Sequence, residues 1–120
     1  MESFDWIFFI YDDDLILTEE DDPAEAISYF YPQSMTMDYQ RLLSGHLIGL
    51  YRSVTKLLGS PPEIIKFGKK KFTMLKSEKF AIFLGVPVDK HSDMATINMC
   101  EFIVDVLLFL IQSINYLIVS

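Results

Sequence analysis

Runs of apolar and β-branched residues divide the chain into strand-like and helix-like segments. Residues 6–11 (WIFFIY) are apolar at every position, and residues 79–88 contain a second such run (FAIFL). Unbroken apolar runs of this length are typical of strands that are covered on both faces. Shorter strands are predicted at residues 26–31, 63–67 and 71–76, each bounded by turn-forming residues.

Residues 36–58 have the clearest helical period in the chain. Apolar residues recur there at spacings of three and four: Leu43, Leu47, Leu50, Val54, Leu57 and Leu58. This spacing places them on one helical face, which predicts a buried stripe centred near Leu43 and Val54. Ser34 or Thr36 can cap the first turn, and Gly59 followed by Ser-Pro-Pro predicts the end of the helix. A second helix is predicted from residue 93 or 96 to residue 111 or beyond.

The predicted order is therefore strand, strand, long helix, three strands and helix. Strands that are apolar on both faces need helices on both sides, so we expect an α/β domain with a three-layer α/β/α sandwich. Its five-stranded sheet is mixed or antiparallel, because short turns join antiparallel strands and the long helix allows a crossover. Residues 1–120 form a single domain, in which we expect Phe9, Leu47, Val54 and Phe83 to be nearly fully buried.

Composition narrows the function classes. A hydrophobic fraction of 51% argues against disorder, and the single cysteine excludes an internal disulfide and fits a reducing, cytoplasmic location. The acidic first residues do not resemble the basic start of a signal peptide. The net charge of −7 speaks against nucleic acid as a partner.

The charges are also segregated along the chain. Ten of the 17 acidic residues lie in the first 25 positions, and six of the 10 basic residues lie between Lys66 and Lys79. Such segregation can steer a charged partner, or it can reflect two solvated loops.

No residue pattern predicts a catalytic, cofactor or metal site. The acidic triplet that begins at Asp12 lacks the glycine and glutamate spacing of a calcium loop. His46 is expected at the edge of the helical stripe. His91 stands beside Ser92 and Asp93, but residues adjacent in the chain cannot form the catalytic relay of a triad. Cys100 lies among apolar helix residues and is interpreted as a small core residue. We therefore expect no enzyme activity and no cofactor.

The outer face of the long helix suggests a partner surface. Opposite the predicted stripe lie Arg41, Gly45, Ile48, Gly49, Arg52 and Lys56. Two helix-interior glycines each cost about 1 kcal/mol relative to alanine, which close packing against something else can offset. That neighbour is either a partner backbone or the domain's own sheet. The strand at residues 63–67, with Ile64 and Lys66, extends the surface by strand addition if it forms the sheet edge.

Several strings resemble a known family. They are FFIYD at residues 8–12, EDDP followed by YFYP up to residue 32, LLSG at residues 42–45, SPP at residues 60–62, and Lys71-Phe72. Over residues 4–110 the chain resembles the first-longin-domain family that includes Inturned, the CCZ vacuolar-fusion subunits and, most similar in these strings, the fourth Hermansky–Pudlak syndrome protein. The resemblance implies a longin fold and a second longin subunit as partner. It also implies that the assembled complex acts as a guanine-nucleotide exchange factor for a Rab GTPase, on endosomal or lysosome-related membranes.

The carboxyl-terminal residues leave an alternative open. Residues 112–120 do not resemble the family's continuation, so we expect Leu117 and Ile118 to lack packing partners. The segment from residue 102 to 119 is very apolar, which suggests instead a small membrane-associated protein anchored by this segment. Against this, the charge-free stretch after Asp105 is shorter than the roughly 20 residues of a spanning helix. A hydrolase or transferase is a third class of function, but the sequence contains no set of catalytic residues that would indicate one.

Overall fold

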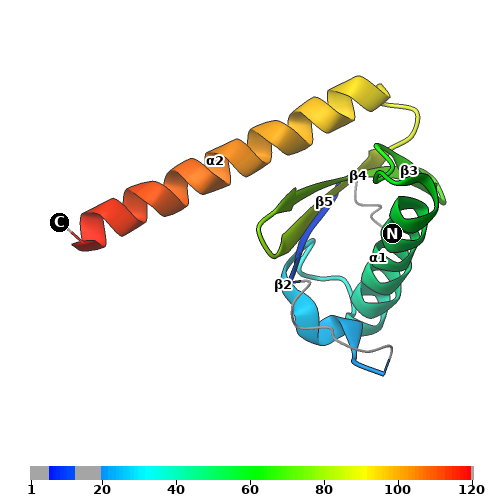
Figure 1. Ribbon diagram of the computed structural model, residues 1–120, viewed down its shortest axis with the longest axis horizontal. Helices are drawn as coiled ribbons and strands as arrows, with labels where there is room; N and C mark the ends of the chain where they lie inside the picture. The colour runs from blue at the N-terminus through cyan, green and yellow to red at the C-terminus, as the bar shows by residue number, and fades with distance from the viewer. Residues whose placement is uncertain (1–5, 13–19, 120) are drawn as a thin grey trace.

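The computed structural model describes residues 6–12 and 20–119, and its helices and strands follow the predicted order (Figure 1). The strands are β1 (Ile7–Asp12), β2 (Ile27–Tyr31), β3 (Ile65–Phe67), β4 (Lys70–Ser77) and β5 (Phe80–Pro87). The helices are α1 (Met37–Leu58), α2 (Asp93–Val119) and the short 3-10 helix η2 (Pro23–Ala26).

The five strands form one sheet in the order β2-β1-β5-β4-β3, and every neighbouring pair is antiparallel. Of the two predicted alternatives, the antiparallel sheet is therefore the observed one. The apolar run of β5, predicted to be covered on both faces, lies at the centre of the sheet. β2 and β3 form the two edges, and α1 connects one edge to the other.

One face of the sheet packs against α1. Its buried residues include Ile7, Phe9, Tyr11, Phe30, Phe72, Ala81 and Phe83 from the strands, and Leu43, Leu47, Ile48 and Tyr51 from α1. The ring of Phe9 stacks on those of Phe30 and Phe83, with centroids 5.3 and 4.6 Å apart. Full burial of a large apolar side chain stabilises the fold by roughly 1.5–3 kcal/mol. This aromatic stack is therefore a main contributor to the core.

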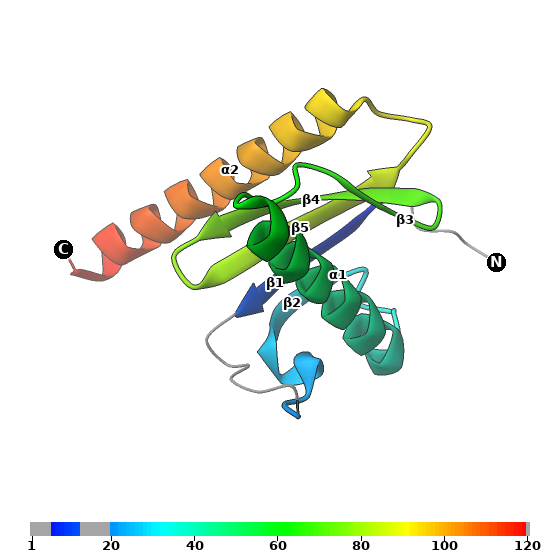
Figure 2. The same ribbon diagram turned by 45° about the vertical axis from the view of Figure 1, so that its right-hand side comes forward.

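The opposite face packs against α2 (Figure 2), which completes the predicted three layers. Its buried residues are Ile82, Leu84, Val86, Cys100 and Val104. Because α2 lies over β4 and β5, Phe8 and Ile10 of β1 are only half buried on this side. The second face is thus less completely covered than the first.

The boundaries of α1 follow from its capping residues. The Thr36 hydroxyl accepts a hydrogen bond from the Tyr39 amide at 3.2 Å, which satisfies one of the free amides of the first turn. At the other end Gly59 has φ 81°, the left-handed conformation that glycine adopts without strain. Gly59 was predicted for its role, and of the two predicted caps, Ser34 and Thr36, the structure shows Thr36.

The buried stripe of α1 differs from the predicted one. Leu47 is fully buried, as expected, but Val54 is only half buried and Leu57 is 82% exposed. The prediction for Val54 is wrong because Tyr51 fills the space over the sheet instead. The Tyr51 ring packs edge-on against Phe83, and its hydroxyl donates a hydrogen bond to a backbone carbonyl at 3.4 Å. An amphipathic tyrosine is easily omitted from an apolar pattern.

Gly85 is required by close packing within the sheet. It lies directly opposite Phe72 in the β4–β5 ladder. The Phe72 ring occupies the space that a Cβ atom at Gly85 would need. A larger residue at this position would therefore displace a fully buried aromatic ring.

We predict that Leu47→Ala lowers the free energy of unfolding by about 2–5 kcal/mol, because it leaves a cavity beneath α1. Chemical denaturation of the two proteins measures the difference. The matched control is Leu57→Ala, since Leu57 is 82% exposed, and it should change stability by less than about 0.5 kcal/mol. Equal losses in the two variants would contradict this packing of α1.

Candidate functional site

The side chains that could carry chemistry lie far apart in the fold and have structural partners. Asp12 is buried at the end of β1 and pairs with Lys79 at 3.3 Å, whereas the rest of the acidic triplet lies outside the described residues. His91 packs edge-on against Trp6, and His46 lies on the exposed side of α1 near Phe67, rather than at the core edge as expected. Within residues 6–12 and 20–119, no three metal-binding side chains come together.

A reactive cysteine must have a thiol that is accessible to solvent, and Cys100 is the one cysteine of the chain. It is buried between α2 and the sheet, as predicted. Burial raises the pKa of the Cys100 thiol to about 11. The protein therefore holds it as the neutral thiol, which is a poor nucleophile.

The outer face of α1 is only partly the surface that the sequence predicted. Ile48 is buried in the core, so its expected place on this face is wrong. It belongs to the stripe that Leu47 and Tyr51 define, one position away from the predicted stripe. A Cβ atom on Gly45 would lie 3.4 Å from Pro23, so the domain itself covers this glycine. A Cβ atom on Gly49 would meet nothing within 4 Å apart from the helix's own backbone and the neighbouring residues, and Gly49 is open to solvent.

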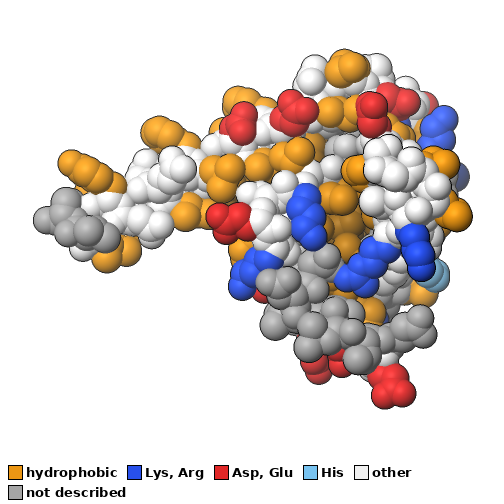
Figure 3. Space-filling model, viewed as in Figure 1, with side chains coloured by type: hydrophobic (Ala, Val, Ile, Leu, Met, Phe, Trp, Pro, Cys, Tyr) orange, Lys and Arg blue, Asp and Glu red, His pale blue; other side chains and the backbone are white. Residues whose placement is uncertain are grey.

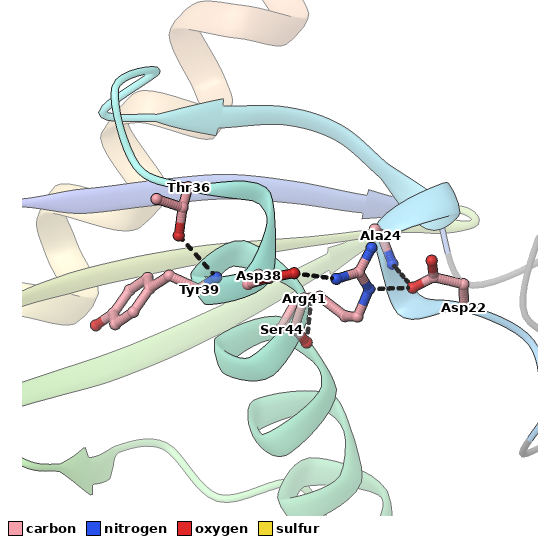
Figure 4. A network of polar contacts seen from close by, with 7 residues as sticks. All are labelled: Asp22, Ala24, Thr36, Asp38, Tyr39, Arg41 and Ser44. Carbon is pink, nitrogen blue, oxygen red and sulfur yellow. Dashed lines mark hydrogen bonds and ion pairs between the residues drawn. The ribbon is translucent and has the colours of Figure 1, made fainter.

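Arg41 links the start of α1 to the segment before η2 (Figure 4). Its guanidinium donates to Asp22 at 2.7 Å and to Asp38 at 2.8 Å. The hydrogen bond from Arg41 holds the pKa of the Asp22 carboxyl below its usual value, with help from the Ala24 amide. Arg41 therefore organises one end of the α1 surface, and its own charge is largely matched by these two carboxylates.

The sheet edge formed by β3 continues along β4, because β3 is shorter than β4. β3 pairs only with Lys70–Phe72 of β4, and Ile64 lies just before it, half buried, while Lys66 is exposed. No strand among the described residues pairs with residues 73–77 of β4 on that side. The backbone edge that is available for pairing with another strand is thus mainly in β4. In the sequence, only the shorter apolar run of β3 indicates this.

A groove of about 400 Å³ lies beside this open edge, between the end of α1 and the β4–β5 hairpin. Apolar side chains form much of its lining: Ile48, Tyr51, Pro61, Met74 and Ala81. Arg52, Lys56 and Lys76 also line it. Figure 3 shows hydrophobic side chains in a hollow flanked by basic ones. The sequence predicted Arg52 and Lys56 on the outer face of α1 but did not predict this groove. It also missed Met74 and Lys76, which face α1 because of the alternation along β4.

α2 is fixed to the sheet at its first turn. The Lys71 ammonium, on a side chain that is only 5% exposed, pairs with Asp93 at 2.9 Å. The hydrogen bond from Lys71 lowers the pKa of the Asp93 carboxyl. The basic residues between Lys66 and Lys79 were interpreted as a solvated loop or as charges that steer a partner, but Lys71 is a buried structural residue.

The other end of α2 leaves the domain (Figure 1). We call residues 106–118 the projecting segment. Its exposed apolar side chains are Val106, Leu108, Phe109, Leu110, Ile111, Ile114, Tyr116, Leu117 and Ile118. The expectation that Leu117 and Ile118 lack packing partners is confirmed, since they are 75% and 77% exposed. In the described part of the chain, one helix, Asp93–Ile118, is long enough and apolar enough to cross a membrane. Only 17% of its 18-residue apolar window is buried inside the protein.

We predict that deleting residues 112–120 leaves the melting temperature of the domain within about 2 °C of its original value. None of the side chains of residues 112–118 is buried, so their loss removes little packing. The deletion should raise solubility, because it removes exposed apolar surface. Thermal unfolding followed by circular dichroism and centrifugation assays measure both effects. A cooperative loss of folding would show that this segment supports the core.

Comparison with known proteins places this fold in a family. The family described as the first longin domain of INTU, CCZ1 and HPS4 matches residues 6–116. A curated relative, the BLOC-3 complex member HPS4 of Mus musculus, is 35% identical over 82 residues. Those residues make up 68% of this chain but only 12% of the relative, so the chain spans a small part of the length of that protein. The chain belongs to the family of first longin domains of INTU, CCZ1 and HPS4.

Proposed function

We propose that this chain is a non-catalytic interaction module of a heterodimeric complex built from longin subunits. In this proposal the complex acts as a guanine-nucleotide exchange factor for a Rab GTPase. It serves vesicle trafficking and the biogenesis of lysosome-related organelles, and it is cytoplasmic and recruited to endosomal or lysosome-related membranes. The observation that carries the proposal is the family match over residues 6–116.

The surface beside α1 supports a second longin subunit as the partner. Gly49 leaves a smooth, open patch on the helix, and the edge of β4 at residues 73–77 adjoins the groove. A partner helix can lie against the patch while a partner strand pairs with the open edge. Arg52 and Lys56 line the groove, and their positive charges favour acidic groups on the partner.

The placement of the chemistry-bearing residues supports a binding role over a catalytic one. Among the described residues, Cys100 is buried, His46 is exposed on α1 and His91 packs against Trp6, and no three His, Cys, Asp or Glu side chains come together. An enzyme needs such groups within hydrogen-bond reach of one another or of a common substrate. Exchange of a nucleotide requires instead that the assembled complex reshape its target GTPase, for which interaction surfaces suffice.

The test of the partner surface is a pull-down of the full chain from cell extract with mass spectrometry, using unaltered protein and Gly49→Leu. We expect the unaltered chain to recover a longin-domain protein and Gly49→Leu to lose it. Gly49 has open space around it, so leucine should leave the melting temperature nearly unchanged. Ile48 is unsuitable for this test, because a charge at this buried position would unfold the core.

Gly49→Ala is the matched control, because it adds a single methyl group at the same position and should retain the partner. Leu57→Ala on the exposed end of α1 provides a second control. If Gly49→Leu retains the longin partner, the interface lies elsewhere. If the unaltered chain recovers no longin-domain protein, the proposed role in a longin heterodimer is wrong.

The exchange role makes a separate prediction. The purified complex of the chain with its longin partner should accelerate the release of labelled GDP from a Rab GTPase, whereas the chain alone should not. A stopped-flow fluorescence assay measures both rates across a panel of Rab GTPases. Acceleration by the isolated chain would contradict the proposed division of labour, and a complex inactive on every Rab would contradict the exchange role.

A further inference from the structure

The projecting segment presents apolar side chains in nearly every direction, and its polar residues are Gln112, Ser113 and Asn115. Successive helical residues point about 100° apart, so Phe109, Leu110 and Ile111 face three different directions. Residues 116–118 repeat these directions two turns later. All six side chains are between 49% and 77% exposed. No charged residue occurs in residues 106–118, and Figure 3 accordingly shows neither red nor blue atoms at this end of the molecule.

A protein partner does not account for this distribution well. A helix that docks in a groove or pairs with a second copy presents one apolar face and keeps its other face polar. Val104, Leu107, Ile111, Ile114 and Ile118 do recur at spacings of four and three, as a pairing stripe would. Such pairing would leave Phe109 and Tyr116, 67% and 72% exposed, on the outside of the pair. A helix that exposes large uncharged apolar side chains on opposite sides, as Phe109 and Ile111 do here, is typical of a large protein core or of lipid.

We propose that the projecting segment inserts into one leaflet of a lipid bilayer. At about 1.5 Å per residue the segment is roughly 20 Å long, which is shorter than the hydrocarbon core of about 30 Å. It can therefore enter a leaflet without crossing the bilayer. α2 carries the segment away from the sheet (Figure 2), so the folded domain remains in water when the segment inserts.

The charge distribution specifies the kind of lipid. The segment has no lysine or arginine to bind anionic headgroups, and the whole chain has a net charge of −7. Insertion is therefore driven by apolar area, and anionic lipids oppose it through charge repulsion. The partner chemistry is a zwitterionic bilayer surface. This membrane site does not use the α1 surface, so it is independent of the proposed longin partner.

The experiment is flotation of the full chain with phosphatidylcholine vesicles. We expect the unaltered chain to float, and less of it to float with phosphatidylserine vesicles. Leu110→Lys combined with Leu117→Lys should lower vesicle partitioning by at least about tenfold, because two charges would enter the hydrocarbon region. The matched control is Leu57→Lys combined with Leu58→Lys. These leucines are 82% and 75% exposed at the end of α1 and should tolerate the change without loss of flotation.

A second measurement reports insertion directly. Tyr116→Trp should show strong fluorescence quenching by brominated acyl chains, whereas Trp6 of the unaltered chain, outside the projecting segment, should show much less. Equal flotation of the Leu110/Leu117 variant and the unaltered chain would overturn the proposal. A chain that stays in the soluble fraction as a stable dimer by light scattering would also overturn it, and would identify a second copy as the occupant.

Discussion

The rest of the structure depends on the need to cover both faces of one sheet. The two central strands, β1 and β5, carry apolar side chains on both sides. A sheet of this kind is stable in water only when a layer packs on each face. α1 provides one layer and α2 the other. The aromatic stack of Phe9 between Phe30 and Phe83 fixes the first layer, and the pair Lys71–Asp93 fixes the start of the second.

The two layers meet this need to different extents. α1 crosses the sheet and ends at Gly59 soon after its buried stripe ends. α2 runs for 27 residues, about 40 Å, whereas the eight residues of β5 extend about 26 Å. Part of α2 therefore has no sheet beneath it, whatever the side chains there are. This overhanging part of α2 is apolar rather than charged. Its side chains therefore need an apolar surface other than the sheet to cover them.

The sequence predicted the element order, the layers and the helix boundaries because each depends on local signals. Apolar runs identify buried strands, and Thr36 and Gly59 act within one turn of the helix that they bound. The rotation of α1 about its axis was less predictable, since it depends on which side chain best fills the space above Phe83. Tyr51 fills that space and turns Ile48 inward, a choice that a count of leucines does not reveal.

The interaction surfaces were predictable only in part, for a related reason. Gly45 and Gly49 look equivalent in the sequence, but Pro23 covers the first and nothing in the described structure covers the second. The open edge of β4 depends on how far β3 pairs, which is a long-range property. Similarly, the approach of Phe72 to Gly85 requires two strands in register and cannot be read from either strand alone.

The placement of the two surfaces has a mechanical consequence. The α1 surface and the projecting segment belong to opposite layers, with the sheet between them. A partner that binds over Gly49 therefore need not compete with a bilayer that receives residues 106–118. The Lys71–Asp93 pair holds the first turn of α2, and Cys100 and Val104 pack on the sheet, so the sheet sets the direction of the helix. A domain held in a membrane through this segment would keep its α1 layer separated from the insertion point by the sheet.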